Sequence, residues 1–225
     1  MANAKAKTVL AALALLACAM LGGCASLLGG GEKSQSTLYA PDPRIAADPS
    51  WPTADWQLSV SRPSSARMTD TLRISVRPTP DEVQVYKGAA WAKLPSDLVE
   101  DTLTRALEDS GRINAIARQG TGVAADYKLV MDLRRFEADY AGNALPSATI
   151  EINAKLLHTI DQGIVGSRTF LHAEPAATAN VKDVVDAFTK SLTRTGADMA
   201  LWVLQTGNAH EASAHADGAP AKRHR

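Results

Sequence analysis

The chain contains few cysteines, few aromatic residues and no excess of charge of either sign. Its only cysteines, Cys18 and Cys24, lie near the N-terminus, so a domain further along the chain has no disulfide of its own. The 24 basic and 24 acidic residues balance, which gives no support to nucleic-acid binding, because such binding requires a basic surface. Hydrophobic residues still make up 45% of the chain, which is enough for the core of one globular domain without a stabilising disulfide.

The sequence also lacks the motifs of common hydrolases, metalloproteases and nucleotide-binding proteins. It has neither G-x-S-x-G nor H-E-x-x-H. The run Gly29–Ser34 is similar to a phosphate loop, but Glu32 stands where that loop needs glycine, and no strand precedes it. The run Gly120–Ala125 has the spacing G-x-G-x-x-A, but a strand-like run follows where a helix should begin. We therefore predict a protein that is not an enzyme and binds no cofactor.

The five histidines do not form a metal-binding pattern. His158 and His172 flank a predicted hairpin and could face each other, whereas His210, His215 and His224 lie in a polar C-terminal stretch. No cysteine is left in this part of the chain to complete a zinc site. We predict structural or solvated roles for all five and no metal site.

The N-terminus has the layout of a secretory signal peptide. A basic segment, Met1–Lys7, is followed by the apolar run Val9–Leu21 and by two glycines. As a helix the apolar run spans about 20 Å, which is shorter than the bilayer core of about 30 Å. A transmembrane segment is therefore the weaker alternative. Residues 1–23 are predicted to be a signal peptide.

The sequence Leu21-Gly22-Gly23-Cys24 is similar to the lipobox of bacterial lipoproteins. We predict cleavage between Gly23 and Cys24 and lipidation of Cys24, so that a covalent acyl lipid is the only prosthetic group. Two or more acyl chains anchor a protein stably. Cleavage before Cys18, or a plain secretory signal, remain the alternatives. Ala25 replaces the aspartate that retains lipoproteins in the inner membrane in enteric-type sorting, which favours the outer membrane.

The rest of the chain divides into three parts. Residues 24–54 are rich in Gly, Ser, Pro and Ala without an apolar period, and we predict a lipidated N-terminus and flexible tether. Residues 55–205 have the patterns of one α/β domain. Residues 206–225 are polar and aperiodic, and we predict a disordered tail.

Apolar periodicity predicts the elements of the domain. A helix begins at Pro95 and ends before Gly111, and a second begins after Asn180 and ends at Gly207. Alternating apolar and polar residues, with a turn at Asp161-Gln162-Gly163, predict strands over 56–60, 72–76, 83–86, 113–117, 127–133, 148–156 and 164–172.

The order of these segments resembles a known family. The segment RMTDTLRISVRPTPDEVQVYKGAAWAKLP precedes the helix LVEDTLTRALEDSGR, and the runs Leu133–Glu137, Asp161–Gly163 and Trp202–Leu204 follow. From about Leu38 to Leu204 this pattern resembles the ABC-type transport auxiliary lipoproteins, which accompany MCE-type lipid transporters. The usual Tyr-Leu-Leu start is replaced here by Leu38-Tyr39-Ala40.

The resemblance implies a fold, a set of partners and a location. The expected fold is an α/β sandwich of a mixed, largely antiparallel sheet with two main helices. The expected partners are an MCE-domain membrane protein of an ABC lipid transporter, the outer membrane through the lipid anchor, and further copies of the chain, which in this family often form a ring. The resemblance supplies no catalytic residues. Tyr86, Trp91 and Phe136 are matched positions that are either core aromatics or a partner surface.

The resemblance therefore implies a non-catalytic docking lipoprotein on the periplasmic face of the outer membrane. Two other functions remain open. A periplasmic lipid-binding carrier would need an apolar cavity inside the domain, and a structural envelope lipoprotein would have no transport partner.

Overall fold

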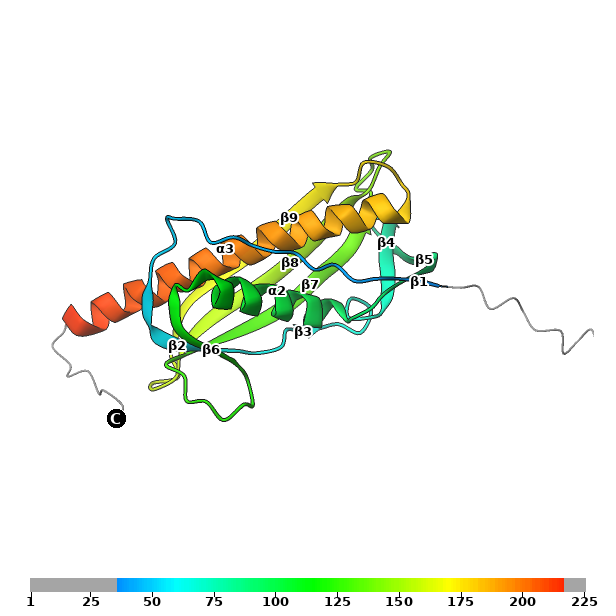
Figure 1. Cartoon of the computed structure of the whole chain (residues 1–225). Helices are drawn as coiled ribbons and strands as arrows, with labels where there is room; N and C mark the ends of the chain where they lie inside the picture. The colour runs from blue at the N-terminus through cyan, green and yellow to red at the C-terminus, as the bar shows by residue number, and fades with distance from the viewer. Residues whose placement is uncertain (1–35, 217–225) are drawn as a thin grey trace, which may run out of the picture. The chain divides into compact units, whose positions relative to one another are not determined.

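The computed structural model describes residues 36–216. The elements in chain order are β1 (Thr37–Tyr39), β2 (Ala54–Val60), β3 (Ser64–Ser65), β4 (Arg73–Thr79), β5 (Glu82–Trp91), α2 (Pro95–Ser110), β6 (Ile113–Arg118), β7 (Tyr127–Asp139), β8 (Ser147–His158), β9 (Ile164–Pro175) and α3 (Val181–Ala216). All strands of this described part join one mixed sheet. Both helices cover the same face of it (Figure 1), which confirms the predicted α/β sandwich.

Strand β7 is the centre of the sheet. Along one edge it pairs in parallel with β2, β3 and β4, one after another. Along its other edge it pairs antiparallel with β8 over nearly its whole length, and β8 continues into an antiparallel hairpin with β9. The longest ladders are thus antiparallel, whereas β2, β3 and β4 are joined to β7 in parallel.

Helix α2 has the bounds that the sequence predicts. Pro95 is its first residue, and Gly111 follows it in the left-handed conformation with φ +60°, which glycine adopts without strain. The first turn is capped from outside the helix, because the Asp70 carboxylate accepts hydrogen bonds from the Ser96 amide (3.0 Å) and hydroxyl (2.9 Å). The loop before β4 therefore fixes the start of α2 against the sheet.

A β-bulge changes which residues of β7 enter the core. Up to Leu133 the odd-numbered residues are buried, but the register with β8 shifts between Leu133 and Arg135, and Phe136 and Ala138 are buried beyond it. A bulge inserts one extra residue and reverses the alternation of faces. This places Arg135 and Glu137 in an ion-pair network: Arg77 forms two hydrogen bonds to Glu137 (2.9 and 3.0 Å), and Arg135 contacts Glu137 at 2.7 Å.

The prediction of a tether over residues 24–54 is wrong from Ser36 onward. Thr37–Tyr39 pair in parallel with the end of β5, and Trp51 is buried in the core. Asp42 pairs with Arg105 of α2, and a hydrogen bond from Arg105 lowers the pKa of the Asp42 carboxyl. Strand pairing with a distant edge leaves no periodic signal in a three-residue segment, and this explains the error.

The prediction of a disordered tail from residue 206 is wrong up to Ala216, where α3 ends. Gly207 does not terminate the helix. It lies inside α3 at the point where Trp56 packs against the helix backbone, and the Trp56 indole donates a hydrogen bond to Asn208 Oδ1 (2.9 Å). Between residues 36 and 216, no helix is both long enough and apolar enough to cross a membrane.

Candidate functional site

Part of the predicted site lies outside the described residues. Cys24 and Gly23, the predicted lipidation and cleavage positions, precede residue 36. The side chain of His215 and the whole of His224 are likewise not described. Predictions at these positions therefore stay predictions.

Trp91 and Phe136 are core residues, so the prediction that they contribute to a partner surface is wrong. Each is 1% exposed. Phe136 stacks on Phe188 of α3 with ring centroids 4.8 Å apart, and Trp91 meets both rings edge-on at 5.1 and 5.7 Å. The cluster joins β5, β7 and α3. Trp91 and Phe136 are therefore core aromatics, which was the other of the two roles expected for them.

Tyr86 is half-buried on β5 and does not form an exposed aromatic rim. Its hydroxyl has no hydrogen-bond partner within residues 36–216, and burial raises the pKa of Tyr86 to about 12. A buried, unsatisfied hydroxyl lowers stability. The side chain therefore offers a partner neither a projecting ring nor an accessible hydroxyl.

The sequence-predicted contact between His158 and His172 does not form. His172 Nε2 lies 3.1 Å from Asp198 Oδ2 of α3. His158 lies at the far end of the same hairpin, next to the turn, where its Nδ1 contacts Asp161 Oδ1 at 3.1 Å. In the antiparallel register His172 is opposite Ile150, which places the two histidines many residues apart along the ladder.

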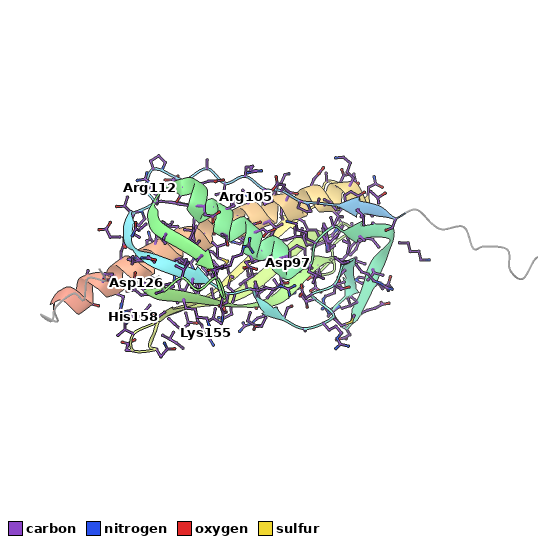
Figure 2. All side chains as sticks on the ribbon, turned by 60° about the horizontal axis from the view of Figure 1, so that its bottom comes forward. Asp97, Arg105, Arg112, Asp126, Lys155 and His158 are labelled. Atoms are coloured by element: carbon purple, nitrogen blue, oxygen red, sulfur yellow. The ribbon has the colours of Figure 1, made fainter. Side chains whose placement is uncertain are left out.

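A surface groove lies at the end of the sheet where β7 begins and where β8 turns into β9. Its volume is about 470 Å³, and its lining residues are Gln57, Ser59, Val123, Ala124, Ala125, Asp126, Lys128, Thr159 and Ile160. Asp126 and His158 mark this end in Figure 2. Sequence reasoning missed the groove, because it is assembled from β2, the loop before β7 and the β8–β9 turn.

Two of the polar side chains around the groove form hydrogen bonds with the backbone. The Asp126 carboxylate accepts a hydrogen bond from the Gln57 amide (2.8 Å), and the Thr159 hydroxyl contacts the Ala125 carbonyl at 2.6 Å. Two apolar side chains project from the rim: Val123 is 50% exposed and Ile160 is 72% exposed. Apolar side chains gathered at such a rim are typical of a protein-interaction site.

The glycine-containing run Gly120–Ala125 forms one side of this groove. Gly120 and Gly122 adopt φ values of +93° and +77°, which suit glycine and bend the loop. Strand β7 follows at Tyr127, so no helix N-terminus is available to hold a phosphate. The prediction that this run is a plain loop is confirmed.

The chain matches a known protein family over most of its length. Residues 37–200 match the model of the ABC-type transport auxiliary lipoprotein component. Among solved structures, the chain is similar to a protein of the family DUF330 from Xanthomonas campestris, with 50% identity and a TM-score of 0.76, over 78% of this chain and 99% of that one.

Two more distant similarities complete the comparison. A hypothetical protein from Chlamydia trachomatis shares the fold with a TM-score of 0.50 and 7% identity, over 69% of this chain and 99% of that one. A curated, uncharacterized protein from Bradyrhizobium diazoefficiens is 24% identical over 185 residues, or 82% of this chain. The chain spans about half (49%) of the length of that relative.

Proposed function

The chain belongs to the ABC-type transport auxiliary lipoprotein family, and from this we propose that it is the docking lipoprotein of an MCE-type lipid transport system. In this proposal it has no catalytic role and sits on the periplasmic face of the outer membrane. The family match over residues 37–200 carries the proposal, because it includes every strand and most of α3.

The lipid on Cys24 is the proposed anchor. Ser36 lies twelve positions after Cys24, and a chain of that length spans at most about 43 Å when fully extended. The described chain begins at β1, which lies at the end of the sheet away from the β8–β9 turn (Figure 1). This arrangement supports a membrane-proximal β1 and a groove that points into the periplasm.

The groove is the proposed contact for the MCE-domain partner. Its position away from β1 and its exposed apolar rim suit a protein that approaches from the opposite membrane. The aromatic cluster of Trp91, Phe136 and Phe188 fills the space between the sheet and the helices. That packing favours docking over a carrier function, which would need an apolar cavity at this position. Self-association into a ring is also part of the proposal.

We expect Cys24→Ser to release the protein from the membrane. The full-length protein would be purified in gentle detergent from its own envelope, beside the Cys24→Ser variant, and co-purifying proteins and lipids would be identified by mass spectrometry. An MCE-domain protein should accompany the wild type and be lost from the variant, because both the acyl chains and the local concentration at the membrane are lost.

Other outcomes of that purification would select the alternatives. Stoichiometric lipid without a partner protein would favour the carrier. The absence of both lipid and partner protein from the sample would exclude the transport function and leave a structural envelope lipoprotein. Native mass spectrometry of the same sample would report the number of copies in the assembly.

We expect Ile160→Asp to weaken the partner contact without unfolding the domain. Ile160 is 72% exposed, so a charge there costs little in the free protein but places an unpaired carboxylate in the interface. Recovery of the partner should fall about tenfold or more, while the melting temperature changes little. The matched control is Leu171→Asp on β9, where the side chain is 57% exposed and lies opposite Glu151, away from the turn that lines the groove. Equal loss of partner in both variants would argue against the groove.

A further inference from the structure

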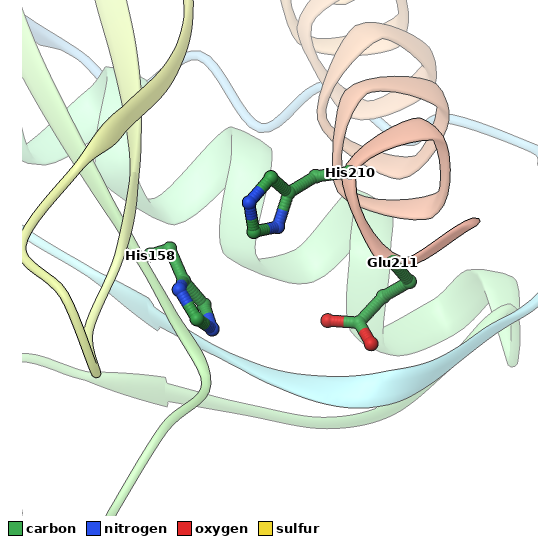
Figure 3. Close-up of side chains that lie close together, drawn as sticks. All are labelled: His158, His210 and Glu211. Atoms are coloured by element: carbon green, nitrogen blue, oxygen red, sulfur yellow. The ribbon is translucent and has the colours of Figure 1, made fainter. Parts of the chain in front are cut away.

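Three polar side chains from distant parts of the sequence meet beside the β8–β9 turn. His158 ends β8, and His210 and Glu211 lie near the end of α3 (Figure 3). One potential ligand atom of each side chain lies within 4.8 Å of the other two, and all three residues are partly buried. The two imidazole rings are 4.8 Å apart between centroids.

Two imidazoles and one carboxylate are a ligand set that Zn²⁺ uses in proteins, with a water molecule in the fourth position. We propose that His158, His210 and Glu211 bind one divalent transition-metal ion, with Zn²⁺ as the preferred ion. The proposal goes beyond docking, because it concerns a site that joins the end of α3 to the sheet. The proposal departs from the sequence-based prediction of no metal, which treated His210 as part of a disordered tail.

The surroundings of His158 prepare its ring for a metal ion. Asp161 Oδ1 lies 3.1 Å from His158 Nδ1 and also accepts a hydrogen bond from the Gly163 amide (2.9 Å). A carboxylate only accepts hydrogen bonds, so this contact favours a hydrogen on Nδ1 and a free lone pair on Nε2. Histidines that bind metals commonly have an outer carboxylate of this kind.

Tyr127 holds the other two residues in place. Its hydroxyl contacts Glu211 Oε1 at 2.6 Å and His210 Nδ1 at 2.7 Å, and the phenol ring is fully buried against Trp56. The ligand atoms of four-coordinate Zn²⁺ lie about 3.3 Å apart, as bonds of about 2.0 Å require. The three side chains would therefore move inward by up to about 1 Å, and the ion would replace the Tyr127 hydroxyl as the partner that His210 and Glu211 share.

The site can be tested by calorimetric titration of ZnCl₂ into the full chain, purified in detergent after treatment with EDTA. We expect one ion per chain and a rise in melting temperature of about 5 °C when Zn²⁺ exceeds its Kd about 100-fold. His158→Ala should weaken binding by at least about tenfold, since loss of even an outer partner of a ligand has effects of about 10–100-fold. Glu211→Gln should also weaken binding, and it keeps an oxygen that can accept the Tyr127 hydrogen bond.

The controls separate this site from other histidines. His172→Ala removes a histidine that pairs with Asp198 elsewhere in the domain, and the double variant His215→Ala, His224→Ala removes the remaining C-terminal histidines. Both controls should bind Zn²⁺ like the wild type. The proposal would be overturned if the wild type took up no Zn²⁺, if His158→Ala and Glu211→Gln bound it as tightly as the wild type, or if only the C-terminal double variant lost binding. Melting temperatures in EDTA would establish that each variant is folded.

Discussion

Phe136→Ala should lower the free energy of unfolding by about 3–5 kcal/mol, the range typical of a fully buried aromatic residue. Phe136 is 1% exposed, stacks on Phe188 and meets Trp91 edge-on, so its removal leaves a cavity where β5, β7 and α3 join. Total stabilities of domains are about 5–15 kcal/mol, so this change removes a large fraction. Urea denaturation followed by far-ultraviolet circular dichroism would measure it.

A suitable control for Phe136→Ala is Leu171→Ala. Leu171 is 57% exposed on β9, and substitutions at such positions usually change stability by less than about 0.5 kcal/mol. If Phe136→Ala instead left stability unchanged and reduced partner binding, Phe136 would be a surface residue after all. A loss of partner that follows only from unfolding would be reversed by lowering the temperature.

The second large effect is expected for Gly207→Ala. Alanine inside a helix is normally more stable than glycine by about 1 kcal/mol. Here the added methyl carbon would lie 2.7 Å from Cε2 and 2.9 Å from Cη2 of Trp56, and closer still to Cζ2. We expect a net destabilisation of about 1–3 kcal/mol, as overpacking a core typically causes. The helix beyond residue 207 should also exchange its amide hydrogens faster.

A double-mutant cycle would test the cause of that effect. Trp56→Phe removes the ring atoms that collide with the methyl group, although it also removes the hydrogen bond to Asn208. The variant Gly207→Ala, Trp56→Phe should therefore be less destabilised than the sum of the two single variants. Additive effects, or a stabilising Gly207→Ala, would mean that Trp56 does not pack on this turn.

Segments with strong local signals could be predicted well from the sequence. Helix α2 has its proline at the first turn, an apolar stripe and a terminal glycine, all within one segment. The hairpin of β8 and β9 follows from alternation on both sides of a turn, where Gln162 has φ +59°. In these segments the residues that determine the structure are neighbours in the chain.

The errors occurred where a distant contact determines the local structure. Gly207 is typical of a helix end, but Trp56, about 150 positions earlier in the chain, packs against it and lets the helix continue. The bulge in β7 reverses the alternation beyond Leu133 and moves Phe136 into the core. Neither effect is visible in a window of a few residues.

The sequence by itself determined the class of the molecule: a predicted signal peptide and lipobox at Cys24, and one α/β domain whose ordered segments identify its family. These are properties of short, contiguous runs, since periodicity and motif spacing are local. Only the tertiary structure decided which aromatics are core, where the apolar groove lies and that His158 meets His210, 52 residues further along the chain. Such juxtapositions arise when the register of the sheet and the packing of α3 bring distant segments together, and a single sequence carries no local record of those contacts.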